Sequence, residues 1–107
     1  MPVVAPTRLD ALLAFAVTHG ASDMHLKVGA RPVARVNGTL VQMPGTAVIG
    51  PADVDAFADE ILADAPARRR ELDEEGETDV AHAREGVGRF RVGLFRQRGL
   101  VSIAVRV

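Results

Sequence analysis

The chain has 107 residues, 48% of them apolar and 25% charged, which suits one globular domain and argues against disorder or a fibrous repeat. It contains no cysteine, so disulfides, cysteine-based zinc sites and thiol nucleophiles are excluded. The net charge is −1 and no apolar run reaches the roughly 18–20 residues of a membrane span. The start of the chain also lacks a basic-then-apolar leader, so we expect a cytoplasmic domain without direct membrane insertion.

Two further classes of function are disfavoured by residue content. The three histidines show no metal-ligand spacing, so no metal site is expected. Tyrosine and tryptophan are absent and there are only four phenylalanines, which leaves little material for the stacking platforms of nucleic-acid-binding modules. We therefore expect no nucleic-acid partner.

The small net charge hides an asymmetry along the chain. Residues 53–79 carry eleven acidic side chains against three arginines, whereas residues 84–107 carry six arginines against one glutamate. Such a bipolar distribution favours docking on other copies of the chain. The alternative is that the acidic stretch forms only the solvated faces of helices.

The elements can be predicted in chain order. Thr7 and Asp10 have the spacing of a capping box, Asn37-Gly38 is a strong type I′ hairpin signal, and Pro51 and Pro66 suit the first turns of helices. From Glu77 onward the apolar period changes to two. The expected elements are helices over 8–19, 51–64 and 66–76, strands over 23–28, 33–36, 39–43, 78–83, 89–96 and 100–106, and a loop over 44–50. The predicted class is α+β, with an antiparallel sheet of about six strands and helices packed on one face.

The last predicted hairpin sets a register. With a two- or four-residue connection around Arg98-Gly99, both of its apolar sets face the core, and the pattern then places Arg91 directly across from Arg106, with Arg89 on the same face. Because like charges in that position repel, we expect an anion from another chain or a ligand to offset them. The alternative is three solvated arginines on an outer sheet face.

No catalytic motif is recognisable: the chain lacks a phosphate loop, a nucleophile elbow and a zinc-protease signature. Ser22, Asp23 and His25 contain the residue types of a nucleophilic triad, but neighbours on one strand rarely converge as a triad requires. We therefore expect Asp23 and His25 to serve in hydrogen bonding at a surface or a subunit interface, and no catalytic residue in this chain.

Several blocks together resemble the N-terminal domain of the PilT-like pilus retraction ATPases, within the type II/type IV secretion ATPase family. The blocks are 21–26 (ASDMHL), 35–38 (RVNG), 77–79 (ETD), 88–92 (GRFRV) and 105–106 (VR). Gly93 departs from the family pattern, which often has asparagine there. The resemblance implies a PAS-like domain over residues 1–107, followed in a longer protein by a RecA-like ATPase core absent from this chain. An end at Val107, on a strand still in progress, favours the same division.

The resemblance further implies a function. Family members assemble as hexameric rings in which this domain packs on the neighbouring subunit's ATPase core. Arg89, Arg91 and Arg106 match the arginines that reach towards the nucleotide in trans, with ATP and Mg²⁺ as cofactors of the full-length protein only. The ring would act on the pilus inner-membrane platform in twitching motility, at the cytoplasmic face of the plasma membrane. Two alternatives remain: a stand-alone PAS-like sensor, which needs a polar-lined internal cavity, and a purely structural adaptor whose arginines contact acidic protein surface.

Overall fold

The computed structural model describes residues 6–44 and 46–107, which form three helices and six strands. Their bounds in chain order are α1 (Arg8–Thr18), β1 (Asp23–Leu26), β2 (Val33–Val36), β3 (Thr39–Gln42), α2 (Pro51–Ile61), α3 (Pro66–Glu75), β4 (Glu77–Arg84), β5 (Gly88–Gln97) and β6 (Leu100–Arg106). Every predicted element is present. In the predicted loop over 44–50, Gly45 lies outside the described residues.

Local signals determine where several elements begin and turn. At the start of α1, Asp10 N–H donates to Thr7 Oγ1 over 3.1 Å and Thr7 N–H donates to Asp10 Oδ2 over 3.0 Å, which completes the capping box. Asn37 and Gly38 have φ values of 51° and 79°, as a type I′ hairpin between β2 and β3 requires.

Several elements are shorter than predicted, and β1 and α2 differ the most. After β1, the N–H of Gly29 donates to the carbonyl of Ile49, 2.8 Å away, so the chain leaves the sheet at Leu26 instead of Val28. Helix α2 ends at Ile61 instead of Asp64, because the following residues form a turn in which Ala65 N–H donates to Leu62 O over 3.0 Å.

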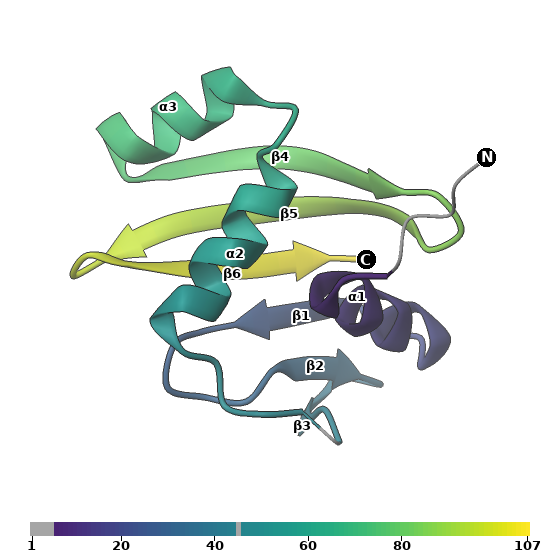
Figure 1. Cartoon of the computed structure of the whole chain (residues 1–107). Helices are drawn as coiled ribbons and strands as arrows, with labels where there is room; N and C mark the ends of the chain where they lie inside the picture. The colour runs from purple at the N-terminus through teal and green to yellow at the C-terminus, as the bar shows by residue number, and fades with distance from the viewer. Residues whose placement is uncertain (1–5, 45) are drawn as a thin grey trace.

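The sheet is antiparallel, with the strand order β3-β2-β1-β6-β5-β4 (Figure 1). The first and last strands of the chain, β1 and β6, therefore pair in the middle, with Met24 opposite Val105. In the β5–β6 hairpin Arg91 lies opposite Arg106, which confirms the predicted register.

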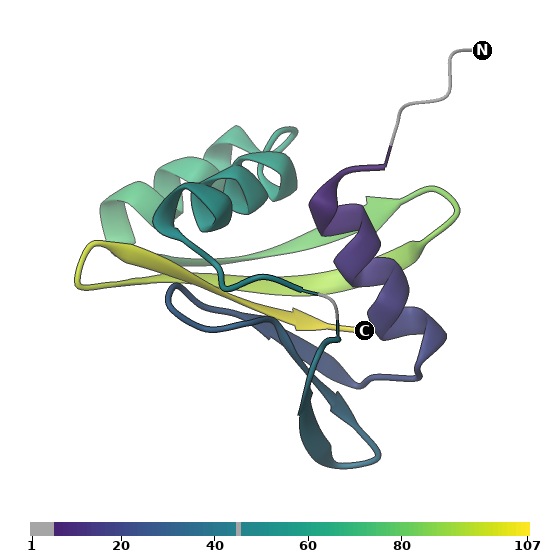
Figure 2. The same cartoon turned by 60° about the horizontal axis from the view of Figure 1, so that its bottom comes forward.

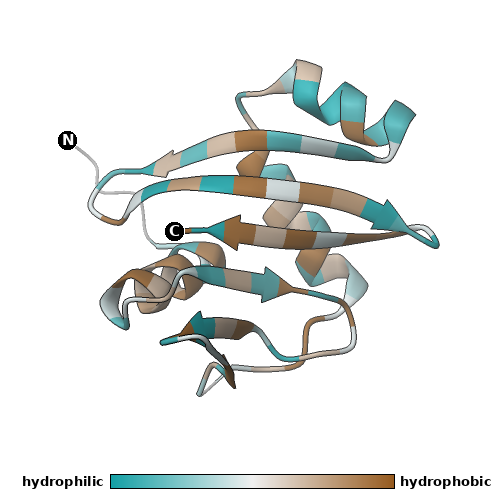
Figure 3. Cartoon of the chain, turned by 180° about the vertical axis from the view of Figure 1, so that it is seen from behind, coloured by the Kyte–Doolittle hydropathy of each residue, from teal (hydrophilic) through white to brown (hydrophobic). Residues whose placement is uncertain are grey.

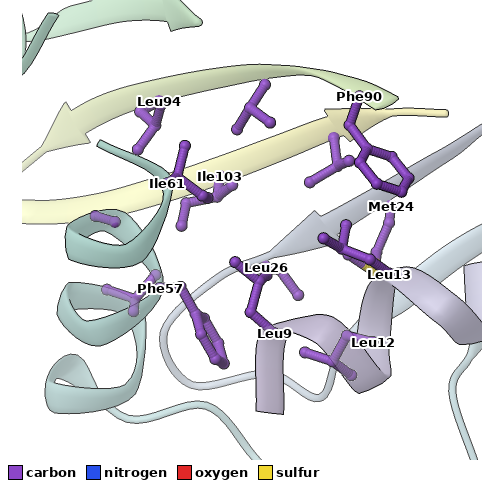
Figure 4. Packing of buried hydrophobic residues seen from close by; sticks show 14 of the residues in the cluster. Leu9, Leu12, Leu13, Met24, Leu26, Phe57, Ile61, Phe90, Leu94 and Ile103 are labelled. Carbon is purple, nitrogen blue, oxygen red and sulfur yellow. The ribbon is translucent and has the colours of Figure 1, made fainter. Parts of the chain in front are cut away.

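One face of the sheet carries the core, and α1 and α2 cover it while α3 runs along the β4 edge (Figures 1 and 2). Leu9 and Leu13 of α1 and Phe57 of α2 pack on the inward side chains of β1, β5 and β6 (Figure 4). The opposite face is bare of helices, as Figure 3 shows with the sheet in front. In the described part of the chain, no helix combines the length and apolar character needed to cross a membrane.

Candidate functional site

The bare face of the sheet holds the residues that the sequence singled out. Pairing places Asp23 of β1, Arg106 of β6 and Arg91 of β5 in one row across three adjacent strands. The next row contains His25, Ala104 and Gly93. These residues line a hollow of about 760 Å³, which we call the arginine hollow. The small residues Ala104 and Gly93 lie among the longer side chains of Asp23, His25, Arg91 and Arg106, and they leave the space of the hollow open.

Arg91 and Arg106 lie directly opposite each other and are both exposed. Neither forms an ion pair with any residue in the ranges 6–44 and 46–107, and the same holds for Arg89. Arg89 joins the other two in lining an adjoining hollow of about 570 Å³. The three predicted arginines are therefore on one face, and no carboxylate of the described residues lies within ion-pair distance of them.

Asp23 is the centre of a local polar network. The Ser22 hydroxyl donates to Asp23 Oδ1 over 2.7 Å, and His25 Nε2–H donates to Oδ2 over 2.6 Å. The Arg35 guanidinium lies 3.3 Å from Oδ1. The Ser22 and His25 hydrogen bonds and the Arg35 charge lower the pKa of Asp23 below its ordinary value of 3.8, the Ser22 bond most strongly. Asp23 is thus a carboxylate near neutral pH.

This network is not a nucleophilic triad. Ser22 and His25 each bond to Asp23, and no hydrogen bond joins the serine to the histidine. A triad instead needs the histidine between the other two groups, where it can take the serine proton. Among the described residues, no group of three histidine and carboxylate side chains is arranged to hold a metal ion.

Asp79 is a member of the hollow that the sequence reasoning missed. It lies opposite Gly93 across the β4–β5 pair and lines the arginine hollow. A Cβ at position 93 would come within 3.2 Å of Asp79 Oδ1, so the glycine leaves room for this carboxylate. The position of Asp79 opposite Gly93 could have been predicted from the sequence. A tight turn at residues 85–87 sets the register of the β4–β5 pair and brings the two positions together.

Relatives with known roles match this chain over most of its length. It is 38% identical over 88 residues to a type IV pilus retraction ATPase, PilT, of Pseudomonas aeruginosa, with 80% of this chain and 24% of the relative covered. It is 32% identical over 98 residues to the type IV pilus ATPase PilU of the same organism, covering 91% of this chain and 25% of PilU. A crystal structure of the pilus retraction motor PilT with bound ADP superposes with a TM-score of 0.84 at 32% identity, over 94% of this chain and 29% of that one. The chain belongs to the PilT-like secretion ATPase family.

The matching region is the N-terminal domain of those proteins, so the expected family and fold class are both confirmed. The ATPase DotB of Legionella pneumophila has the same fold, with a TM-score of 0.74 at 22% identity over 100% of this chain and 31% of DotB. No protein-family model matches the chain. The chain spans about a quarter of the length of the curated pilus ATPases that it matches.

Proposed function

We propose that this domain serves a pilus retraction ATPase by packing on the ATPase core of a neighbouring subunit in a hexameric ring and presenting Arg89, Arg91 and Arg106 to bound ATP. The observation that carries the proposal is the opposed pair of Arg91 and Arg106, neither of which forms an ion pair with a described residue. Exposed like charges directly across a sheet oppose folding, and a phosphate group supplied by another subunit offsets that repulsion.

Guanidinium groups suit this role for a chemical reason. Arginine stays charged at all physiological pH values and offers a planar fork of donors that matches two phosphate oxygens. A hollow of about 760 Å³ leaves space for such a group beside the pair. Asp23 and His25 line the same hollow, and they serve in our proposal as hydrogen-bonding residues of the subunit interface.

The proposal extends to the setting of the full-length protein. ATP and Mg²⁺ are cofactors of the ATPase core and not of this domain alone, because the 107 residues contain no phosphate loop. The ring works at the cytoplasmic face of the membrane against the pilus inner-membrane platform, in twitching motility. A sensor role is less well supported, since the core is apolar and its buried polar residues in the described ranges are Asp10 and Thr78.

Two measurements test the proposal. Calorimetry on the 107-residue chain should detect no micromolar affinity for ATP and Mg²⁺. Tight binding would contradict the assignment of these cofactors to the ATPase core alone. In the full-length protein, Arg91→Ala should lower ATP turnover per assembled ring, while Arg31→Ala, an exposed arginine outside the hollow, should not.

The loss of ATP turnover expected in these variants can be estimated, and it should depend on the shape of the guanidinium group. An arginine acting in trans is worth about 10³–10⁵ in rate in other phosphoryl-transfer systems, and we expect less for each residue here because three share the work. Arg91→Lys should restore only part of the turnover, because a point charge lacks the bidentate fork. Wild-type turnover in the alanine variants of all three arginines would refute the proposal. Loss of assembly without loss of turnover per ring would favour a structural adaptor.

A further inference from the structure

A second groove lies on the helix side of the sheet, away from the arginine hollow. Residues 80–84 of β4 form one wall, and the end of α2 with the α2–α3 connection forms the other. The groove has a volume of about 480 Å³. Its charged and titratable lining residues are Asp10, Glu60, Asp64, His82 and Arg84. We call it the β4 groove.

Two buried polar atoms beside this groove lack a hydrogen-bond partner in the described ranges. Asp10 is only 4% exposed, and its Oδ2 accepts from Thr7 N–H and lies 3.1 Å from Arg84 Nη2. Its Oδ1 has no hydrogen-bond partner among the described residues, and the same is true of the buried His82 Nε2. Buried polar atoms are nearly always paired in folded proteins, and leaving them unpaired costs free energy. Both atoms are shielded from solvent, so the accessible charge of the groove comes from its other lining residues.

The charge of the groove points to a cationic donor. Glu60 and Asp64 form no ion pair within residues 6–44 and 46–107. The guanidinium of Arg84 already forms an ion pair with Asp10. Three carboxylates thus face one arginine, and this negative lining repels phosphate groups and attracts ammonium or guanidinium groups.

The wall formed by β4 has an open edge. β4 is the last strand in the sheet order, so no strand of the described residues pairs on its far side. Helix α3 lies along only the first part of β4, where Thr78 Oγ1 donates to Glu71 Oε1 over 2.7 Å (Figure 1). Beyond that helix, residues 80–83 form no backbone hydrogen bond within the described ranges other than those of the β4–β5 ladder. Such an edge is a template for an added strand.

We propose that the β4 groove binds an extended basic segment of a partner protein. The segment adds to the open edge of β4 through its backbone, and one of its lysine or arginine side chains enters the groove between Glu60 and Asp64. The cationic head forms ion pairs with these two carboxylates at the rim of the groove. This surface lies outside the arginine hollow, although residues 81–83 also line the adjoining hollow that contains Arg89.

The test uses the 107-residue chain and two fluorescein-labelled peptides, one of alternating threonine and lysine and one of alternating threonine and glutamate. Anisotropy should report saturable binding of the lysine peptide only. A lysine peptide with N-methylated backbone amides should bind markedly more weakly, because it cannot complete a strand pair. In NMR spectra the amide shifts of residues 80–84 should change most.

Matched variants separate the groove from the general acidity of the helices. The double variant Glu60→Gln/Asp64→Asn should weaken binding about three- to tenfold, the size expected for two partly exposed ion pairs. The control Asp55→Asn/Glu74→Gln removes the same charge at exposed positions outside the groove and should change affinity much less. Equal losses in the two variants, absence of saturable binding, or undiminished binding of the methylated peptide would overturn the proposal.

Discussion

Removing the charge of Arg91 should make the isolated domain more stable. Arg91 is exposed, lies directly opposite Arg106 and forms no ion pair with a described residue. Arg91→Met eliminates the repulsion but keeps an unbranched stem of similar reach over the sheet. Methionine is also tolerated in a strand, so the backbone should not change.

The magnitude follows from the geometry of opposed residues. Side chains directly across an antiparallel pair contribute roughly 0.2–1 kcal/mol, with a destabilising sign for like charges. Two unit charges about 6 Å apart repel by about 0.7 kcal/mol in bulk water. We therefore expect Arg91→Met to raise the free energy of unfolding by about 0.5 kcal/mol at low salt, or about 2–4 °C in Tm. In about 1 M salt, where the Debye length is about 3 Å, the gain should disappear.

Urea unfolding followed by far-UV circular dichroism is the suitable assay, since the chain has no tryptophan or tyrosine to report by fluorescence. A double-mutant cycle with Arg106→Met isolates the coupling between the two guanidinium groups, which should be repulsive. Arg31→Met removes an exposed arginine elsewhere and serves as the control. A loss of more than about 1 kcal/mol in Arg91→Met, or an attractive coupling, would refute the reasoning, because it would show that the pair stabilises this fold.

Three further predictions concern stability. Phe57 is 4% exposed in the core, so Phe57→Ala should cost roughly 3–5 kcal/mol in urea unfolding, and a loss below about 1 kcal/mol would contradict its anchoring role. The lowered pKa of Asp23 means that its stabilising contribution is present above its ordinary value of 3.8 and is lost as the pH falls through the lower folded value. Asp23→Asn should therefore weaken the acid dependence of Tm in that range. If the variant showed the same dependence of Tm on pH as the original chain, Asp23 would be excluded as its cause. Thr7→Ala removes the cap of α1 and should cost about 1 kcal/mol, whereas Thr7→Ser should be nearly neutral if the hydroxyl is what matters.

Part of the site was predictable because it depends on local pairing. The β5–β6 hairpin has only one register that buries Phe90, Val92 and Val105 together, and that register places Arg91 opposite Arg106. The position of Asp79 beside Gly93 follows from the same kind of argument applied to the neighbouring hairpin. Asp23 and His25 were correctly placed together on one face of their strand, where both are half-buried, but their partners were not predicted. Arg35 reaches Asp23 from the adjacent strand, a contact that strand alternation alone does not specify.

The sequence by itself determined the existence and order of the elements, the register of the β5–β6 hairpin, and membership of a family through short motifs. These features depend on residues close together in the chain, where capping, turn chemistry and strand alternation act directly. Only the tertiary structure decided that β1 pairs with β6, which brings Asp23 beside Arg106 across more than eighty residues of sequence. It also decided that the start of α1, the end of α2 and β4 meet around Asp10 to form the β4 groove. Such contacts depend on how the helices pack on one face of the sheet, and no local period in the sequence encodes that choice.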